Sequence, residues 1–313
     1  YGVWERSEKK AAVHYPAIKS FDSLEEMLAD DAIDLVVVNT PTYTHYDFTK
    51  KALEHNKHVL VEKAFTATAE EAEELVRIAE EKKLLLGVFQ NRRYDSDLKT
   101  VKKVLDSGEL GDIKEAEFRW DRYTLELSAK AHKETRNAGS GLLHDLGPHL
   151  IDQAIYLFGM PASLFGFLAS TRQDSVVNDY FDILLFYKSF NVRLKSSLIV
   201  KGPQPSFILH GTAGSFLKTR ADVQEDELKQ SIKPGGANWG REPESEQGLL
   251  HTKDGITAVT TEQGNYMELY DGWYQSLLHK TALPVSGSDA VKVMRIIAAV
   301  QKSNGEKRVV ALS

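Results

Sequence analysis

The strongest constraint on the fold is a pattern that occurs three times in succession between residues 33 and 93. Nearly continuous apolar runs at residues 33–38, 58–61 and 84–89 alternate with amphipathic segments at about 44–55 and 68–83. Strands that are apolar on both sides are buried on both sides, and helices between them cover the faces of a parallel sheet. The first part of the chain therefore predicts a doubly wound α/β domain.

Polar residues directly follow each apolar run. In chain order they are Asn39-Thr40-Pro41, Glu62-Lys63 and Asn91-Arg92. In open α/β sheets, ligands bind in the crevice outside the carboxyl ends of the strands. Three polar strand ends in succession therefore indicate a ligand-binding crevice, although the structural alternative for each is a solvated loop.

The sequence contains no glycine-rich phosphate-binding motif at the required position. The strand, turn and helix that carry this motif would precede Tyr1, so we interpret the chain as beginning inside an N-terminally incomplete dinucleotide-binding domain, near the end of its second strand. Arg6 and Ser7 then follow that strand, where arginine receives the 2′-phosphate of NADP. This favours NADP, while the adjacent Glu5 leaves NAD open and a surface arginine is the alternative.

The second part of the chain predicts a different architecture. Residues 111–120 alternate between apolar and polar, and further strand-like segments follow at 163–171, 180–187, 192–200 and 206–210. Consecutive strands with short connections form a mostly antiparallel sheet, and such a sheet can leave one face open.

This change of pattern divides the chain. We expect a dinucleotide-binding domain over residues 1–118 and an α+β domain for substrate binding and oligomerisation over residues 119–313. Within the second domain, residues 223–248 are expected to be an irregular excursion, and 266–279 and 288–303 to be closing helices, the last capped near Asn304-Gly305.

Composition excludes several classes of protein. The 313 residues exceed what one hydrophobic core usually serves, and the net charge of −6 comes from interspersed acidic and basic residues, without a broad basic field for nucleic acid. The absence of cysteine excludes disulfides, thiolate nucleophiles and cysteine zinc sites. We expect no metal site. No apolar run approaches the roughly 20 residues that span a bilayer and no secretory signal is present, so we expect a cytoplasmic protein.

One stretch, residues 141–152, combines a helix start with titratable residues. Pro148 suits a first helical turn, and an apolar stripe continues to Gly159. Asp145, His149 and Asp152 share one face if the first turn is already helical at Asp145. A carboxylate beside an imidazole can exchange a proton at neutral pH. The structural alternative is that Asp145 caps the helix and His149 packs in the core.

Together these motifs resemble the Gfo/Idh/MocA family, the glucose–fructose oxidoreductase and inositol dehydrogenase group of NAD(P)-dependent sugar and polyol dehydrogenases. The resemblance covers essentially the whole chain. Its landmarks are Asn39-Thr40-Pro41 with His45, Val61-Glu62-Lys63, and Asp145-Leu146-Gly147-Pro148-His149 with Asp152. Within the family, residues 91–97, 139–141 and 145–153 are most similar to the NADP-dependent scyllo-inositol 2-dehydrogenase branch.

The resemblance implies hydride transfer between NADP, or NAD, and the secondary alcohol or ketone of a cyclic polyol or sugar. Lys63 would polarise the reacting oxygen, His149 would exchange its proton, and Asp145 would orient and tune that pair. The cofactor contacts are then expected to be Arg6, Ser7, Asn39, Thr40, Pro41, His45, Glu62, Lys63 and Asn91. The substrate contacts are expected to be Arg92, Arg122, Tyr123, His144, Asp145 and His149.

The chain also departs from the family pattern. Ala64 replaces a proline, which removes a rigid bend after Lys63. His144 stands where the close branch often has an aromatic residue, which makes the substrate pocket more polar. Residues 124–136 carry fewer arginines than the inositol branch, which bears on the identity of the substrate.

Two alternatives to a working dehydrogenase follow from the sequence. One is a regulatory protein that binds dinucleotide without turnover, which the intact set of Lys63, Asp145 and His149 disfavours. The other is an inactive, N-terminally truncated fragment. The expected partners are a small polyol or sugar and further copies of the chain, as a dimer or tetramer through the open sheet face, without nucleic acid or membrane.

Overall fold

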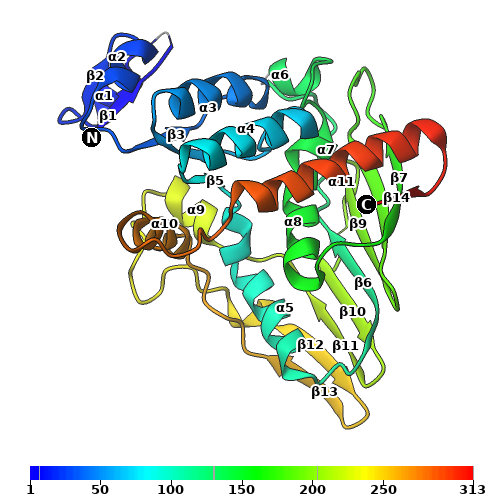
Figure 1. The fold of residues 1–313 in the computed structure, drawn as a ribbon. Coiled ribbons are helices and arrows are strands. Elements are labelled where there is room, and N and C mark those ends of the chain that lie inside the picture. The colour runs from blue at the N-terminus through cyan, green and yellow to red at the C-terminus, as the bar shows by residue number, and fades with distance from the viewer. Residues whose placement is uncertain (7, 130, 203, 313) are drawn as a thin grey trace.

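The computed structural model describes residues 1–6, 8–129, 131–202 and 204–312. Within these residues the strands form three sheets: two small parallel sheets near the N-terminus and one large sheet that spans the rest of the molecule (Figure 1).

The two small sheets build the first domain. Strands β1 (Gly2–Trp4) and β2 (Lys19–Phe21) pair in parallel, and β3 (Leu35–Val38), β4 (His58–Val61) and β5 (Leu86–Val88) pair in parallel in that order. The helices between them are α1 (Lys10–His14), α2 (Leu24–Ala29), α3 (His45–Glu54) and α4 (Ala69–Lys82), with a 3-10 turn, η1 (Thr42–Thr44), before α3. The predicted doubly wound parallel sheet is confirmed.

Local sequence explains where α4 begins, and distant packing explains how the sheet is covered. Thr68 and Glu71 form a reciprocal capping box, in which each side chain accepts the other's backbone N–H. Helices α3 and α4 pack side by side. Leu60 of β4 packs instead against Leu269 and Trp273 of α10 (Met267–His279), a helix near the end of the chain.

The large sheet builds the second domain. It has nine strands in the order β13-β12-β11-β10-β6-β9-β8-β7-β14, and every neighbouring pair is antiparallel except β6 with β9. The strands are β6 (Ile113–Arg119), β7 (Ser163–Ala169), β8 (Tyr180–Phe186), β9 (Asn191–Ser197), β10 (Phe207–Gly211), β11 (Gly214–Lys218), β12 (Gly248–Thr252), β13 (Gly255–Val259) and β14 (Val310–Ala311). This confirms the predicted mostly antiparallel sheet.

Helices cover one face of the large sheet. Both α8 (Gly147–Phe158) and α11 (Gly287–Glu306) pack on it, as Figure 1 shows. Along β8, Phe181, Ile183 and Leu185 are completely buried while the residues between them are partly exposed. This alternation is that of a sheet with one face in the core. The remaining helices are η2 (Asn91–Tyr94), α5 (Ser96–Ser107), α6 (Ala131–Glu134), α7 (Leu142–Asp145), α9 (Gln224–Lys229) and η3 (Glu244–Glu246).

Several elements differ from the sequence prediction. The segment expected to be irregular contains α9, and strands β11, β12 and β13 were not predicted. Helix α11 continues past Gly305 to Glu306 and ends at Lys307 in the left-handed conformation, so the predicted cap near Asn304 is wrong. The Asn304 side chain is bound within the tertiary structure, where it accepts a hydrogen bond from the Leu168 N–H of β7 (3.0 Å). The domain boundary at residue 118 stays a prediction.

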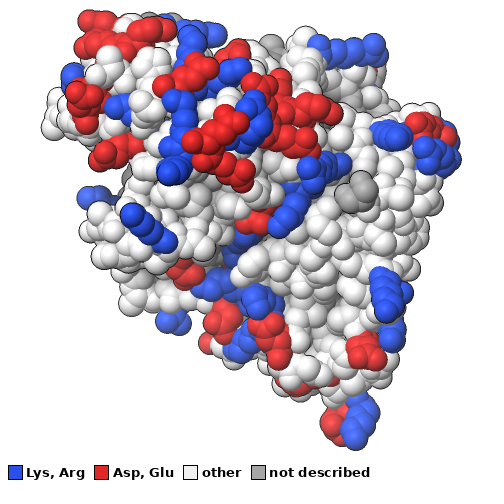
Figure 2. Space-filling view, viewed as in Figure 1, with Lys and Arg blue, Asp and Glu red and all other residues white. Residues whose placement is uncertain are grey.

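Two further features concern the expectations about nucleic acid and membranes. On the face seen in Figure 2, acidic and basic side chains are interspersed over the first domain, and no extended field of one sign appears. Among the described residues, no helix has both the length and the apolar character needed to cross a membrane.

Candidate active site

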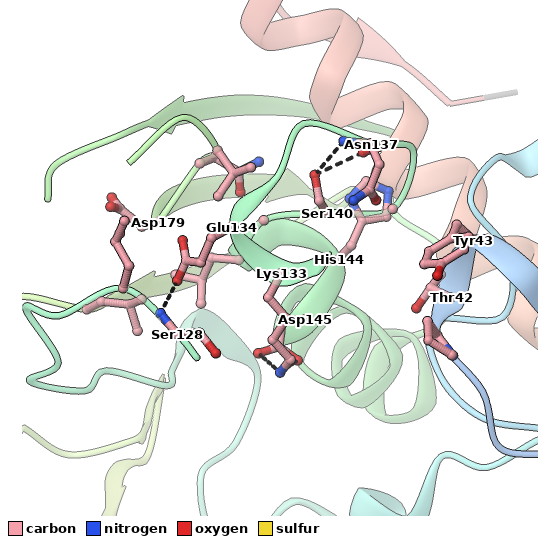
Figure 3. Close-up of a pocket in the computed structure, with 18 of the residues that line it drawn as sticks. Thr42, Tyr43, Ser128, Lys133, Glu134, Asn137, Ser140, His144, Asp145 and Asp179 are labelled. Carbon is pink, nitrogen blue, oxygen red and sulfur yellow. Dashed lines mark hydrogen bonds and ion pairs between the residues drawn. The ribbon is translucent and has the colours of Figure 1, made fainter. Parts of the chain in front are cut away.

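A cavity of about 480 Å³ lies at the carboxyl ends of β3 and β4, and residues between 122 and 128 and between 133 and 145 line it from the other side (Figure 3). Among the residues that line it are these predicted site residues: Asn39, Thr40, Pro41, Glu62, Lys63, Arg122, His144 and Asp145. Side chains that are distant in the sequence and come from two sheets therefore meet in one cavity.

Lys63 and Asp145 form the central contact of this cavity. The Lys63 Nζ donates a hydrogen bond to the main-chain oxygen of Asp145 (2.8 Å) and lies 3.4 Å from its Oδ1. Lys63 is held at the carboxyl end of β4, where the Glu62 N–H donates to the Val38 oxygen (2.9 Å). Burial lowers the pKa of Lys63, and the carboxylates of Asp145 and Glu62 oppose this shift only in part.

Asp145 is positioned by a helix start that is completed from elsewhere in the chain. Gly141 precedes α7 with φ +86°, and the Leu142 and Leu143 N–H groups donate to the main-chain oxygen (2.7 Å) and Oδ1 (2.8 Å) of Asn178. A Cβ on Gly141 would lie 2.6 Å from Asn178 Nδ2. Only glycine fits this approach, so the glycine and the distant asparagine together set the position of Asp145.

The predicted common face of Asp145, His149 and Asp152 stays a prediction. Helix α7 ends at Asp145 and α8 begins at Gly147, and Leu146 between them lies in the right-handed helical region. The Asp152 carboxylate pairs with Arg93, with Nε–Oδ2 and Nη2–Oδ1 distances of 2.8 and 2.7 Å. Asp145 also does not cap α8, whose start has no side-chain cap.

His149 lies in the first turn of α8, outside the lining of the cavity, is 5% exposed and packs against the Trp120 ring at a centroid distance of 5.4 Å. Its Nδ1 is buried and has no hydrogen-bond partner among the described residues. Burial lowers the pKa of His149 well below its usual value, and the positive charges of Lys63, Arg92, Arg220 and Arg122 lower it further. The imidazole is therefore neutral at neutral pH and able to accept a proton.

His45 does not line the cavity but supports the segments beside it. It is completely buried, with Nδ1 2.8 Å from the Ala64 oxygen and Nε2 2.7 Å from the Thr40 oxygen. It thus joins the segments that follow β3 and β4. The backbone after Lys63 is held by this contact, although Ala64 replaces the proline of the family pattern.

Other predicted residues lie outside the cavity lining. The Arg92 guanidinium donates to the Tyr266 hydroxyl (2.7 Å) and pairs with Glu225, and Asn91 is buried in the same 3-10 turn. Tyr123 is 49% exposed beneath the Lys201 ammonium. Arg6 is exposed after β1, and Ser7 lies outside the described residues.

Lys133 is a site residue that the sequence analysis missed. From α6 its Nζ lies 3.0 Å from both Oδ1 and Oδ2 of Asp145. Burial alone would raise the pKa of Asp145, but the ammonium groups of Lys63 and Lys133 lower it below its usual value. The contact could not be predicted from the sequence, because Lys133 is a single lysine in a polar segment without periodicity.

The residues at the strand ends fit the nicotinamide half of a dinucleotide. The Thr40 hydroxyl, which can donate and accept, lies 2.8 Å from the Thr44 hydroxyl, and the Glu62 carboxylate accepts the Lys63 N–H (3.0 Å) through one oxygen. The exposed amide of Asn39 adds both a donor and an acceptor. Ribose hydroxyls and a carboxamide require this mixture of donors and acceptors.

Comparisons with known proteins agree with this arrangement. The family described as "Oxidoreductase family, NAD-binding Rossmann fold" matches residues 1–90, and that described as "Oxidoreductase family, C-terminal alpha/beta domain" matches residues 102–312. The chain is 37% identical over 302 residues to scyllo-inositol 2-dehydrogenase (NADP(+)) IolW of Bacillus subtilis (strain 168), over 95% of this chain and 84% of that protein. It is 35% identical over 294 residues to the uncharacterized oxidoreductase YdgJ of Escherichia coli (strain K12), over 93% of this chain and 84% of that protein.

Solved structures show the same overall arrangement. The oxidoreductase yvaA from Bacillus subtilis matches with a TM-score of 0.94 and 35% identity, over 100% of this chain and 90% of that chain. An oxidoreductase from Bacteroides fragilis NCTC 9343 matches with a TM-score of 0.89 and 39% identity, over 100% of this chain and 91% of that chain.

Proposed function

The chain belongs to the Gfo/Idh/MocA family of NAD(P)-dependent oxidoreductases, and we propose that it transfers a hydride between NADP(H) and a secondary alcohol or ketone of an inositol-like cyclic polyol or sugar. One observation carries the proposal. The Lys63 ammonium contacts Asp145 across the two domains, in a cavity at the carboxyl ends of β3 and β4 and within electrostatic range of His149.

The charges of the cavity support a neutral substrate rich in hydroxyl groups. Lys63 and Lys133 are both paired with Asp145. Arg172 is likewise paired with Glu134 and Asp179. Paired charges leave no strong net attraction for an anionic substrate, but their remaining donors and acceptors, with His144, can bind several hydroxyls.

Each proposed catalytic group has a role that its surroundings allow. The neutral His149 accepts the hydroxyl proton during alcohol oxidation, and the protonated Lys63 stabilises the negative charge that develops on the oxygen. Asp145 holds Lys63 in place through its main-chain oxygen. The dinucleotide, when bound, accepts the hydride from the reacting carbon or returns it to the ketone.

The proposal is tested by following the absorbance of reduced nicotinamide with a panel of inositols and aldoses. We expect turnover with at least one cyclic polyol or aldose, and a loss in kcat/KM of about 10²- to 10⁴-fold in Lys63→Met and in His149→Asn. The control is Lys102→Met, because Lys102 is a half-exposed lysine paired with Asp106 on α5, outside the cavity lining.

Cofactor binding without turnover of any substrate in the panel would contradict the proposal and support a regulatory dinucleotide-binding protein. Full activity of both the Lys63 and His149 variants would contradict the assigned roles. The cytoplasmic location expected from the sequence stays a prediction.

A further inference from the structure

We propose that Lys133 is a positioning residue of this active site: its ammonium satisfies the Asp145 carboxylate, which leaves an N–H of Lys63 free for the substrate oxygen. This inference rests on the proposed function of the same site. It concerns a residue outside the expected catalytic set of Lys63, Asp145 and His149.

The distances show that Asp145 binds Lys133 and Lys63 through different atoms. Lys133 Nζ lies 3.0 Å from each carboxylate oxygen, whereas Lys63 Nζ is 3.4 Å from one of them and makes its shorter bond, 2.8 Å, to the main-chain oxygen. An ammonium has three N–H donors. Among the described residues, Lys63 donates one N–H to the main-chain oxygen and one to the long carboxylate contact, which leaves the third for the cavity.

The structure holds Lys133 in this position from the other side of α6. The adjacent Glu134 carboxylate accepts two bonds from Arg172 Nη2 (3.2 and 3.0 Å) and one from the Ser128 N–H (2.8 Å). The Arg172 side chain is only 3% exposed and is itself bound to Asp179. Figure 3 shows Lys133 directed at Asp145 while Glu134 is directed at Ser128. The buried Arg172, bound to Glu134 and Asp179, therefore fixes α6, the short helix that carries Lys133.

Removing the Lys133 charge is expected to raise the pKa of Lys63 for two reasons. A like charge nearby disfavours the protonated form, so its loss raises the pKa of Lys63. The Asp145 carboxylate also becomes available to pair fully with Lys63, which raises that pKa again and draws the ammonium away from the cavity. The pKa of Lys63 responds to the charges of Glu62, Asp145 and Lys133. The charge of Lys63 in turn affects the pKa values of His45 and His149.

The direct test measures Lys63 without substrate or cofactor. The intact chain is acetylated with limiting acetic anhydride across a pH series, and peptide mass spectrometry gives the midpoint at which the Lys63 amine becomes reactive. In Lys133→Met we expect this midpoint to move to higher pH by about one unit. In Lys133→Arg, which keeps the charge, and in Lys102→Met we expect it to stay at the wild-type value. A wild-type midpoint in folded Lys133→Met would overturn the proposal.

Steady-state kinetics supply the second readout. We expect Lys133→Met to lower kcat by about 10- to 100-fold, because Lys63 is misplaced, with a smaller change in KM, and Lys133→Arg to restore most of the loss. A rise in KM with unchanged kcat would make Lys133 a substrate contact and overturn the positioning role.

The two tests separate this inference from the proposed function. If the wild-type chain turns over no polyol or sugar, the proposed function fails, yet the labelling midpoint still reports whether Lys133 acts on Lys63. If the wild-type chain is active and the midpoint is unchanged in Lys133→Met, only the inference fails.

Discussion

At the scale of single residues, the site combines a buried imidazole with a buried amine. His149 is buried among positive charges that lower its pKa, and Lys63 is buried beside carboxylates that oppose the effect of burial on its pKa. Both pKa values are shifted downward. The pKa of His149 therefore lies below its usual value of 6.5, and that of Lys63 below its usual value of 10.5.

The lowered pKa values of His149 and Lys63 predict the pH dependence of alcohol oxidation. As pH falls through the pKa of His149, the imidazole becomes protonated and can no longer accept a proton, so kcat/KM decreases on an acid limb below the usual histidine value of 6.5. As pH rises through the pKa of Lys63, the ammonium is lost and kcat/KM decreases on a basic limb below the usual lysine value of 10.5. A pH profile of kcat/KM measures both limbs. An acid limb that persists unchanged in His149→Asn would contradict the assignment.

A second residue-scale prediction concerns the choice of cofactor. Arg6 is exposed directly after β1, where we propose that it receives the 2′-phosphate of NADP. In Arg6→Ala we expect KM for NADP to rise about 10-fold, as for the loss of one charged hydrogen bond, with KM for NAD nearly unchanged. Equal changes for the two cofactors would show that Arg6 does not read the 2′-phosphate.

At the scale of elements, the start of α7 decides where Asp145 lies. The helix begins at a glycine whose φ is +86°, and its first N–H groups are satisfied by Asn178 from the connection between β7 and β8. A substitution here acts on the site without touching the substrate.

We therefore expect Gly141→Ala to lower the free energy of unfolding by about 1–3 kcal/mol, and to lower kcat because Asp145 and Lys63 move. Gly235→Ala is the matched control: its φ is +96°, but no atom lies within 4 Å of the added Cβ and it is not in the cavity lining. The control is expected to lose some stability and keep its kcat. Chemical denaturation and steady-state kinetics measure the two effects, and equal losses of kcat in both variants would contradict this account.

At the scale of the whole molecule, the open face of the nine-stranded sheet is the surface that we propose for self-association. The apolar residues Phe165, Phe167 and Leu184 lie on it beside charged residues such as Asp182 and Arg193, and Phe167 is 43% exposed. An apolar patch with a charged rim is typical of interfaces between subunits.

We expect the wild-type chain to form a homo-oligomer and Phe167→Asp to dissociate it, because the substitution buries a charge in the contact. Light scattering after size-exclusion chromatography measures the mass. Tyr274→Asp on α10, where the side chain is 58% exposed, is the control and is expected to keep the oligomer. A monomeric wild-type chain would contradict the proposed interface.

The sequence alone determined those features whose physical cause is local or periodic. Continuous apolar runs between amphipathic segments specified parallel strands, although Val37 of β3 is 56% exposed, and Thr68 with Glu71 specified the start of α4. Because parallel strands end at the same sheet edge, the meeting of Thr40, Glu62 and Lys63 followed from the order of the strands.

Only the tertiary structure decided the features that depend on a partner from elsewhere in the chain. Asp145 lies where it does because Asn178 completes α7, and it binds Lys133 because Arg172 holds Glu134. Asp152 pairs with Arg93, which precedes it by 59 residues. Such hydrogen bonds and ion pairs leave no period and no motif in the sequence, because their energy depends on distances that arise only when the chain has folded.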